Sequence, residues 1–138
     1  MNTYTFDEIS VGQTESFTVR LTDKEMDAFR EITGDINPLH KDDAYAAEKG
    51  HKSRVAFGML TASYLSTLAG VYMPGERSLI QSVEIKFSQP VYPGDELTVS
   101  GEVTEKNDTF NLIKVKVSVR NQEGKKVLKG SMQIGVME

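Results

Sequence analysis

The sequence predicts an α+β fold in which a curled antiparallel sheet wraps around one hydrophobic helix. Residues 57–72, "FGMLTASYLSTLAGVY", are small or apolar around the whole circumference of a helix, so we expect this helix to be buried on most sides. Four segments with strand-like alternation follow it, and their short polar connections favour antiparallel neighbours over helical crossovers. A strand and helices followed by a run of strands is typical of α+β architecture.

The N-terminal half supplies the first strand and two helices. Polar and apolar residues alternate in residues 14–20, which predicts a strand. Thr22 and Glu25 have the spacing of a capping box, and Gly34 stands where the following helix should end. The residues at helical spacing between them are Met26, Phe29 and Ile32. Residues 41–50, "KDDAYAAEKG", predict a second, short helix.

The C-terminal half supplies the rest of the sheet. Polar turns such as "QPVYPGD", "KNDT" and "NQEGK" separate the alternating segments. The apolar residues that mark the strands are Val83, Ile85 and Phe87, then Leu97, Val99 and Val103, then Val115, Val117 and Val119, and last residues 127–136. There is no internal repeat or linker, so we expect residues 1–138 to form a single domain.

Composition narrows the classes of function. The net charge of -4, with lysines scattered among acidic residues, argues against a nucleic-acid partner. The absence of cysteine excludes disulfides, thiolate nucleophiles and cysteine-ligated metal sites, and it fits a reducing compartment such as the cytoplasm. No segment has the run of roughly 18 apolar residues of a membrane span. We therefore expect a cytoplasmic protein with no membrane partner.

The chemistry concentrates in residues 34–40, "GDINPLH", which hold one of only two histidines. Pro38 breaks any helix here, so a turned loop can bring Asp35 and His40 to face one small volume. A carboxylate and an imidazole can together hold a water and move its protons, which points to the addition or loss of water. The same residues are also ordinary turn formers, and spacing alone leaves both interpretations open.

The wider sequence resembles the MaoC-like hydratase family, the (R)-specific enoyl-CoA hydratases with a hot-dog fold. The likeness covers residues 22–106 and includes "TGDINPLH", "VAFGMLTASYL" and "VEIKFSQPVYPGDELTVSGEVTEK". It implies that Asp35 and His40 are the catalytic pair. Asn37 matches the motif asparagine, which belongs to the substrate site as a group that supports the pair or fixes the loop. The resemblance also implies that the N–H of Gly58 is an oxyanion donor. The start of a buried helix, with its unpaired N–H groups, suits that role independently.

Phe57 departs from the family, because many members have histidine before this glycine. We expect an apolar side chain at the pocket mouth that influences the choice of substrate. Met59 and Ser63 are expected to line the pocket, with the Ser63 hydroxyl bonded to a carbonyl one turn earlier. No nucleophile elbow surrounds Ser63, and His51 lies in a basic polar loop where a solvated histidine is the simpler interpretation.

The sequence therefore predicts an (R)-specific enoyl-CoA hydratase, or (R)-3-hydroxyacyl-thioester dehydratase. Its substrate is an acyl-CoA or an acyl-carrier-protein thioester. Neither metal-ligand spacing nor a glycine-rich phosphate motif is present, so we expect no metal and no cofactor. A thioester hydrolase and a non-catalytic acyl-binding subunit are the alternatives. Because one small sheet covers such a helix only in part, we expect a homodimer or a higher homo-oligomer.

Overall fold

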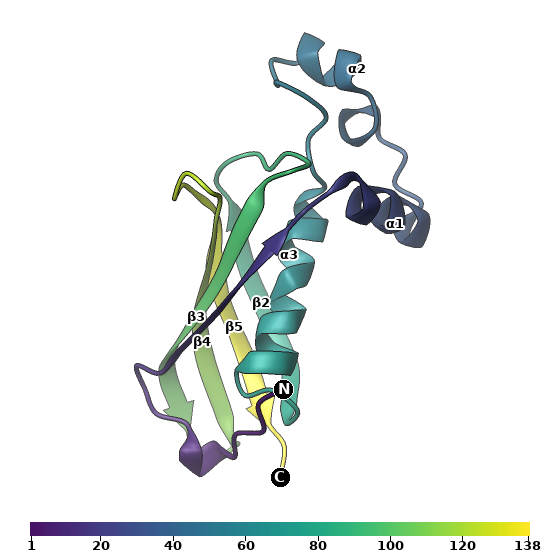
Figure 1. Ribbon diagram of the computed structural model, residues 1–138. Helices are drawn as coiled ribbons and strands as arrows, with labels where there is room; N and C mark the ends of the chain where they lie inside the picture. The colour runs from purple at the N-terminus through teal and green to yellow at the C-terminus, as the bar shows by residue number, and fades with distance from the viewer.

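A single antiparallel sheet of five strands forms the body of the molecule (Figure 1). The computed structural model describes all residues 1–138. The strand order is β1-β3-β4-β5-β2. The bounds are β1 Thr14–Arg20, β2 Ser78–Phe87, β3 Glu96–Asn107, β4 Leu112–Arg120 and β5 Lys126–Val136. The predicted curled sheet is confirmed. The pairing of β2 with β5, the last strand of the chain, is a contact that no turn sequence indicates.

The helices lie close to where the sequence predicts them. They are α1 Asp23–Thr33, α2 Asp43–Glu48 and α3 Gly58–Thr67, with α3 continuing as a π-helical turn, Leu68–Tyr72. Two short 3₁₀ turns complete the list, Phe6–Glu8 and Pro38–His40. The capping box at Thr22 and the left-handed Gly34, with φ of 74°, bound α1 as expected.

The helix α3 runs along the inner face of the sheet (Figure 1). Alternate residues of β3 and β4 are buried beneath it, as expected for a sheet with one dry face. A Cβ at Gly101 would lie 2.9 Å from Val115 and 3.0 Å from Leu68, so this glycine allows the close approach of α3 to the sheet. The central core residues include Leu65, Leu68, Leu97, Val99, Val103, Val115 and Val117.

One side of α3 is uncovered, which differs from the expectation of burial on most sides. Met59 is 63% exposed, and Ser63 and Ser66 are exposed as well. The cause is the place of β2, which is an edge strand. Almost all of its residues are exposed, including the large apolar side chains Leu79, Ile80, Val83 and Phe87. The chain by itself therefore leaves an apolar strip along α3 and β2 open.

The segment from α1 to α2 projects beyond one end of the sheet, beside the start of α3 (Figure 1). Arg54 connects both ends of this segment. The Arg54 guanidinium pairs with Asp23 of α1, and the Arg54 backbone N–H donates to the Asp43 carboxylate of α2 at 2.8 Å. No helix of the structure has the length and apolar character needed to span a membrane.

Candidate active site

The loop after α1 is built from side chains that satisfy its own backbone. The Asp35 carboxylate accepts the Asn37 N–H through Oδ1 at 3.0 Å, and Asn37 Oδ1 accepts the Leu39 N–H at 3.0 Å. The Thr33 hydroxyl accepts the Asp35 N–H at 3.2 Å. The turn interpretation of "GDINPLH" is thus correct as far as folding goes. The turn engages only one oxygen of the aspartate. Asp35 is exposed, and its Oδ2 makes no hydrogen bond within the chain.

His40 is held in one tautomer by the main chain. Its Nδ1 lies 2.8 Å from the carbonyl oxygen of Val55. Because a carbonyl oxygen only accepts, Nδ1 carries the hydrogen and Nε2 keeps its lone pair. The N–H of Val55 in turn donates to the Leu39 carbonyl at 3.0 Å, which ties the two segments together in both directions. The imidazole can therefore take a proton at Nε2 without rearrangement of this contact.

The ring of Phe57 packs against the imidazole of His40. Its ring centroid lies 4.3 Å from that of His40 and 4.9 Å from that of Phe29. Phe57 is 2% exposed, so it lies between the imidazole and the core and not at a pocket mouth, but it does line the cleft that Asp35, His40 and Gly58 share. The tertiary structure buries it because the turn into α3 directs this side chain inward, under α1.

Gly58 is the first residue of α3, directly after Phe57. No side chain caps this helix, and the Gly58 N–H makes none of the turn or cap hydrogen bonds of the chain. It is therefore one of the free donors at the positive end of the helix dipole. A Cβ at this position would lie 3.1 Å from Cε1 of Phe87, so the glycine also makes room for that ring.

Asp35, His40 and Gly58 all line one cleft with a volume of about 740 Å³. The cleft lies between α3 and the edge strand β2, and most of its other lining residues are apolar. These include Phe29, Met59, Ile80, Val83, Phe87 and Met132. An apolar cavity with a few convergent polar groups is the usual form of a small-molecule site. The predicted catalytic residues are thus brought together, although Asp35 and His40 bond to different backbone groups.

A second, smaller cleft of about 320 Å³ adjoins the first. His40, Gly58 and Phe87 line both clefts, so these three residues stand where the two meet. Thr61 lines only the smaller one, which continues toward the segment Ser88–Val91 after β2. The imidazole of His40 and the start of α3 are therefore reached from two directions, whereas Asp35 lines the larger cleft only.

The other predicted residues have the following places. Asn37 does not line the larger cleft and serves the loop, whereas Met59 and Ser63 do line it. The Ser63 hydroxyl donates to the Leu60 carbonyl at 2.6 Å, which confirms the expected helix bond. His51 lies apart from both clefts, with Nδ1 3.2 Å from the Tyr92 hydroxyl.

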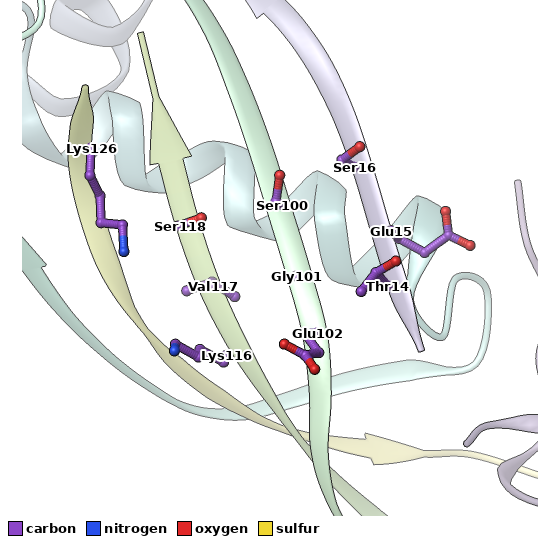
Figure 2. A pocket seen from close by; sticks show the side chains of 10 residues that line it. All are labelled: Thr14, Glu15, Ser16, Ser100, Gly101, Glu102, Lys116, Val117, Ser118 and Lys126. Atoms are coloured by element: carbon purple, nitrogen blue, oxygen red, sulfur yellow. The ribbon is translucent and has the colours of Figure 1, made fainter. Parts of the chain in front are cut away.

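A polar hollow on the outer face of the sheet is a different feature (Figure 2). Cross-strand pairing aligns the small side chains of Ser16, Ser100 and Ser118 between longer charged ones, which creates the depression. Val117 is the one apolar residue that lines it. The sheet separates this hollow from α3 (Figure 2), and it contains no histidine, so it does not belong to the candidate site.

The sequence did not reveal three contributors to the site. Val55 acts through its carbonyl group, which any residue would supply, so no side-chain pattern marks it. Phe29 and Phe87 follow helix and strand periodicity and were assigned as structural residues for that reason. Their place beside His40 and Gly58 depends on how α1 and β2 pack against α3.

The five-stranded sheet curled around α3 defines a class, the hot-dog proteins, and in this chain the loop after α1 brings an imidazole and a carboxylate to a cleft beside the start of α3. Within that class the chain belongs to the MaoC-like family, because residues 8–125 match the model of the MaoC like domain. The resemblance found in the sequence is thus confirmed.

Individual relatives have names that agree with this. The chain is 38% identical over 96 residues to the (R)-specific enoyl-CoA hydratase of Aeromonas caviae, covering 70% of this chain and 72% of that protein. It is 35% identical over 100 residues to the 3-hydroxybutyryl-CoA dehydratase of Methylorubrum extorquens, covering 72% of this chain and 64% of that one. In structure it matches the unliganded R-hydratase PhaJ1 of Pseudomonas aeruginosa with a TM-score of 0.91 and 34% identity, over 97% of this chain and 86% of the other.

Proposed function

We propose that the protein adds water to 2-enoyl thioesters and, in the reverse direction, dehydrates (R)-3-hydroxyacyl thioesters. The observation that carries this proposal is the free Nε2 of His40, which lines the same apolar cleft as Asp35 and Gly58. The names of the relatives support the reaction class and its stereochemistry.

The acid–base step is assigned to Asp35 and His40. Nε2 of His40 and Oδ2 of Asp35 are the two proton-accepting atoms that the loop leaves free. Together they orient one water, whose oxygen bonds to C3 while one of its protons passes to this pair. The π electrons between C2 and C3 move toward the thioester carbonyl, and C2 then takes a proton back from this pair, which returns the enzyme to its starting state. One water is consumed, and no covalent enzyme intermediate forms.

Gly58 is assigned to the carbonyl oxygen of the thioester. Negative charge develops on that oxygen as water adds, and the free N–H at the start of α3 is oriented before the reaction begins. The helix dipole favours the same charge. The apolar wall of the larger cleft suits an acyl chain, and coenzyme A or an acyl-carrier-protein arm is then part of the substrate.

The active unit is proposed to be a homodimer that covers the apolar strip along α3 and β2. Phe87 is 52% exposed at this edge, and it also lines both clefts. An exposed apolar edge strand favours association with another chain. Sedimentation at micromolar concentration should give twice the mass of 15.3 kDa. An active monomer under these conditions would contradict this assembly. A cytoplasmic location stays a prediction.

The direct test is loss of enoyl absorbance in the ultraviolet when crotonyl-CoA is added, with chiral analysis of the product. We expect (R)-3-hydroxybutyryl-CoA. Release of free thiol, followed with a thiol reagent, would instead identify a thioester hydrolase. Binding without either change would identify a non-catalytic acyl-binding protein, and both of these results would overturn the proposal.

A further inference from the structure

We infer that the hydroxyl of Thr61 is a second hydrogen-bond donor to the thioester carbonyl oxygen, beside the N–H of Gly58. The inference rests on the proposed function for the identity of the ligand. It assigns a substrate contact to a buried residue of α3.

Thr61 carries a buried hydroxyl without a partner. The residue is 2% exposed, and its Oγ1 makes no hydrogen bond. Two other helix hydroxyls of this protein are satisfied by the preceding turn: Thr33 donates to the Phe29 carbonyl at 2.9 Å and Ser63 to the Leu60 carbonyl at 2.6 Å. Both of those residues are exposed, whereas Thr61, which has least access to solvent, lacks such a bond. A buried hydroxyl left unpaired is costly, so its retention needs a reason.

The position of Thr61 suggests that reason. It follows Gly58 by three residues, so the two lie on the same face of α3, and helix side chains lean toward the N-terminus. Both residues line the smaller cleft together with His40. Gly58, Thr61 and His40 therefore border one small space, and the first two carry an unpaired N–H and an unpaired O–H.

A carbonyl oxygen that gains charge is the ligand atom that fits this arrangement. It accepts two hydrogen bonds through its two lone pairs, and the positive end of α3 favours the charge that develops. Preorganised donors directed at such an oxygen are a main source of rate enhancement in acyl chemistry. The second unpaired hydroxyl of α3, that of Tyr64, lines neither cleft, so it has no part in this site.

The first experiment compares Thr61→Val with Thr61→Ser in the hydration of crotonyl-CoA. Valine keeps the shape and removes the donor, and we expect a fall in kcat on the order of 10²-fold, the usual effect of losing one such donor. Serine keeps the donor and should stay within about tenfold of wild type. The thermal midpoint of Thr61→Val should be equal to or above that of wild type, because no hydrogen bond is lost.

Thr67→Val is the matched control, since Thr67 belongs to the same helix but lines neither cleft. Its turnover should be unchanged. Equal losses in Thr61→Val and Thr61→Ser, or a Thr61→Val enzyme within twofold of wild type, would overturn the inference.

The second experiment separates this inference from the proposed reaction. Butyryl-CoA labelled with ¹³C at the thioester carbonyl cannot be hydrated, so its infrared carbonyl stretch reports hydrogen bonding alone. We expect a shift to lower frequency on binding to wild type and a smaller shift with Thr61→Val. If that difference occurs in a protein that does not hydrate crotonyl-CoA, the contact stands and the proposed function fails. If wild type hydrates crotonyl-CoA but both proteins give the same shift, the contact fails alone. A wild type that neither binds nor reacts overturns both.

Discussion

The loop from Gly34 to His40 and the start of α3 meet at the same clefts, but they differ in how far their polar groups are hydrogen-bonded within the chain. In the loop, the side chains of Asp35 and Asn37 accept hydrogen bonds from neighbouring N–H groups. At the start of α3, the Gly58 N–H and the Thr61 hydroxyl have no partner. The loop thus offers the free acceptors Oδ2 and Nε2, and the helix offers free donors.

The two segments therefore contribute different kinds of polar group to the clefts. The loop holds the Asp35 carboxylate and the His40 imidazole through one atom of each and leaves a second atom of each free. A helix end leaves donors free without an additional loop, since its first N–H groups have no partner within the helix. Substitutions can therefore alter the loop and the start of α3 separately.

The largest effect is expected from the loop. Asp35→Asn keeps an oxygen that accepts the Asn37 N–H but cannot take a proton, and His40→Ala removes the base entirely. Each change should lower the rate of hydration by about 10²–10⁴-fold, and the double variant should lose less than the product of the two. Binding of butyryl-CoA and the far-ultraviolet circular dichroism should be retained. A near wild-type rate for Asp35→Asn would reduce the loop to a structural turn.

The next largest effect is expected at Phe57, which directly precedes α3 and packs against His40 of the loop. Phe57→Ala removes a buried side chain packed on His40 and Phe29, so the free energy of unfolding should fall by about 3–5 kcal/mol. Urea denaturation followed by circular dichroism measures this. The control is Phe110→Ala, because Phe110 is 70% exposed and should change the free energy of unfolding by less than about 0.5 kcal/mol. Equal effects would show that Phe57 is not part of the core.

A smaller effect is expected at the start of α3. Gly58→Ala would place a Cβ 3.1 Å from the Phe87 ring, so the ring must shift by a few tenths of an ångström. Since a misplacement of about 1 Å can cost about 10²-fold, we expect kcat/KM for crotonyl-CoA to fall on the order of tenfold. Phe87→Leu in the same chain should restore part of it. No recovery in the double variant would mean that the alanine acts on something other than this contact.

The smallest effect is expected at the start of α1, which has a capping box, whereas the start of α3 has none. The hydrogen bond from the Thr22 hydroxyl is the main cause that lowers the pKa of Glu25 below 4.5. Thr22→Ala should lower the free energy of unfolding by about 1 kcal/mol at pH 7. A carboxylate whose pKa is lowered in the folded state stabilises the fold at pH values above its unfolded-state pKa. This stabilisation is lost as the pH falls through the folded-state pKa. The difference between the two proteins should therefore shrink below pH 4.5. Urea denaturation at pH 7 and pH 3 measures it, and an undiminished difference at pH 3 would contradict this cause.

Much of the fold could be predicted because its signals are local. The capping box fixes the start of α1, Gly34 fixes its end, and the alternation in β3 and β4 marks the buried face. The motif from Gly34 to His40 and its pairing with Gly58 also came from the sequence, through the family resemblance. The roles of Asp35, His40 and Gly58 remain predictions that the experiments above test.

What the sequence by itself determined is the set of elements, the family and the residue types able to move protons, since these depend on short-range spacing. Only the tertiary structure decided which atoms of those residues stay free. The tautomer of His40 follows from the Val55 carbonyl, fifteen residues away in the chain. The burial of Phe57 follows from the packing of α1, and the open side of α3 follows from the edge position of β2. That the Thr61 hydroxyl is buried without a partner is likewise visible only in the structure. Contacts between distant segments set these features, because hydrogen-bond satisfaction depends on which groups meet in space.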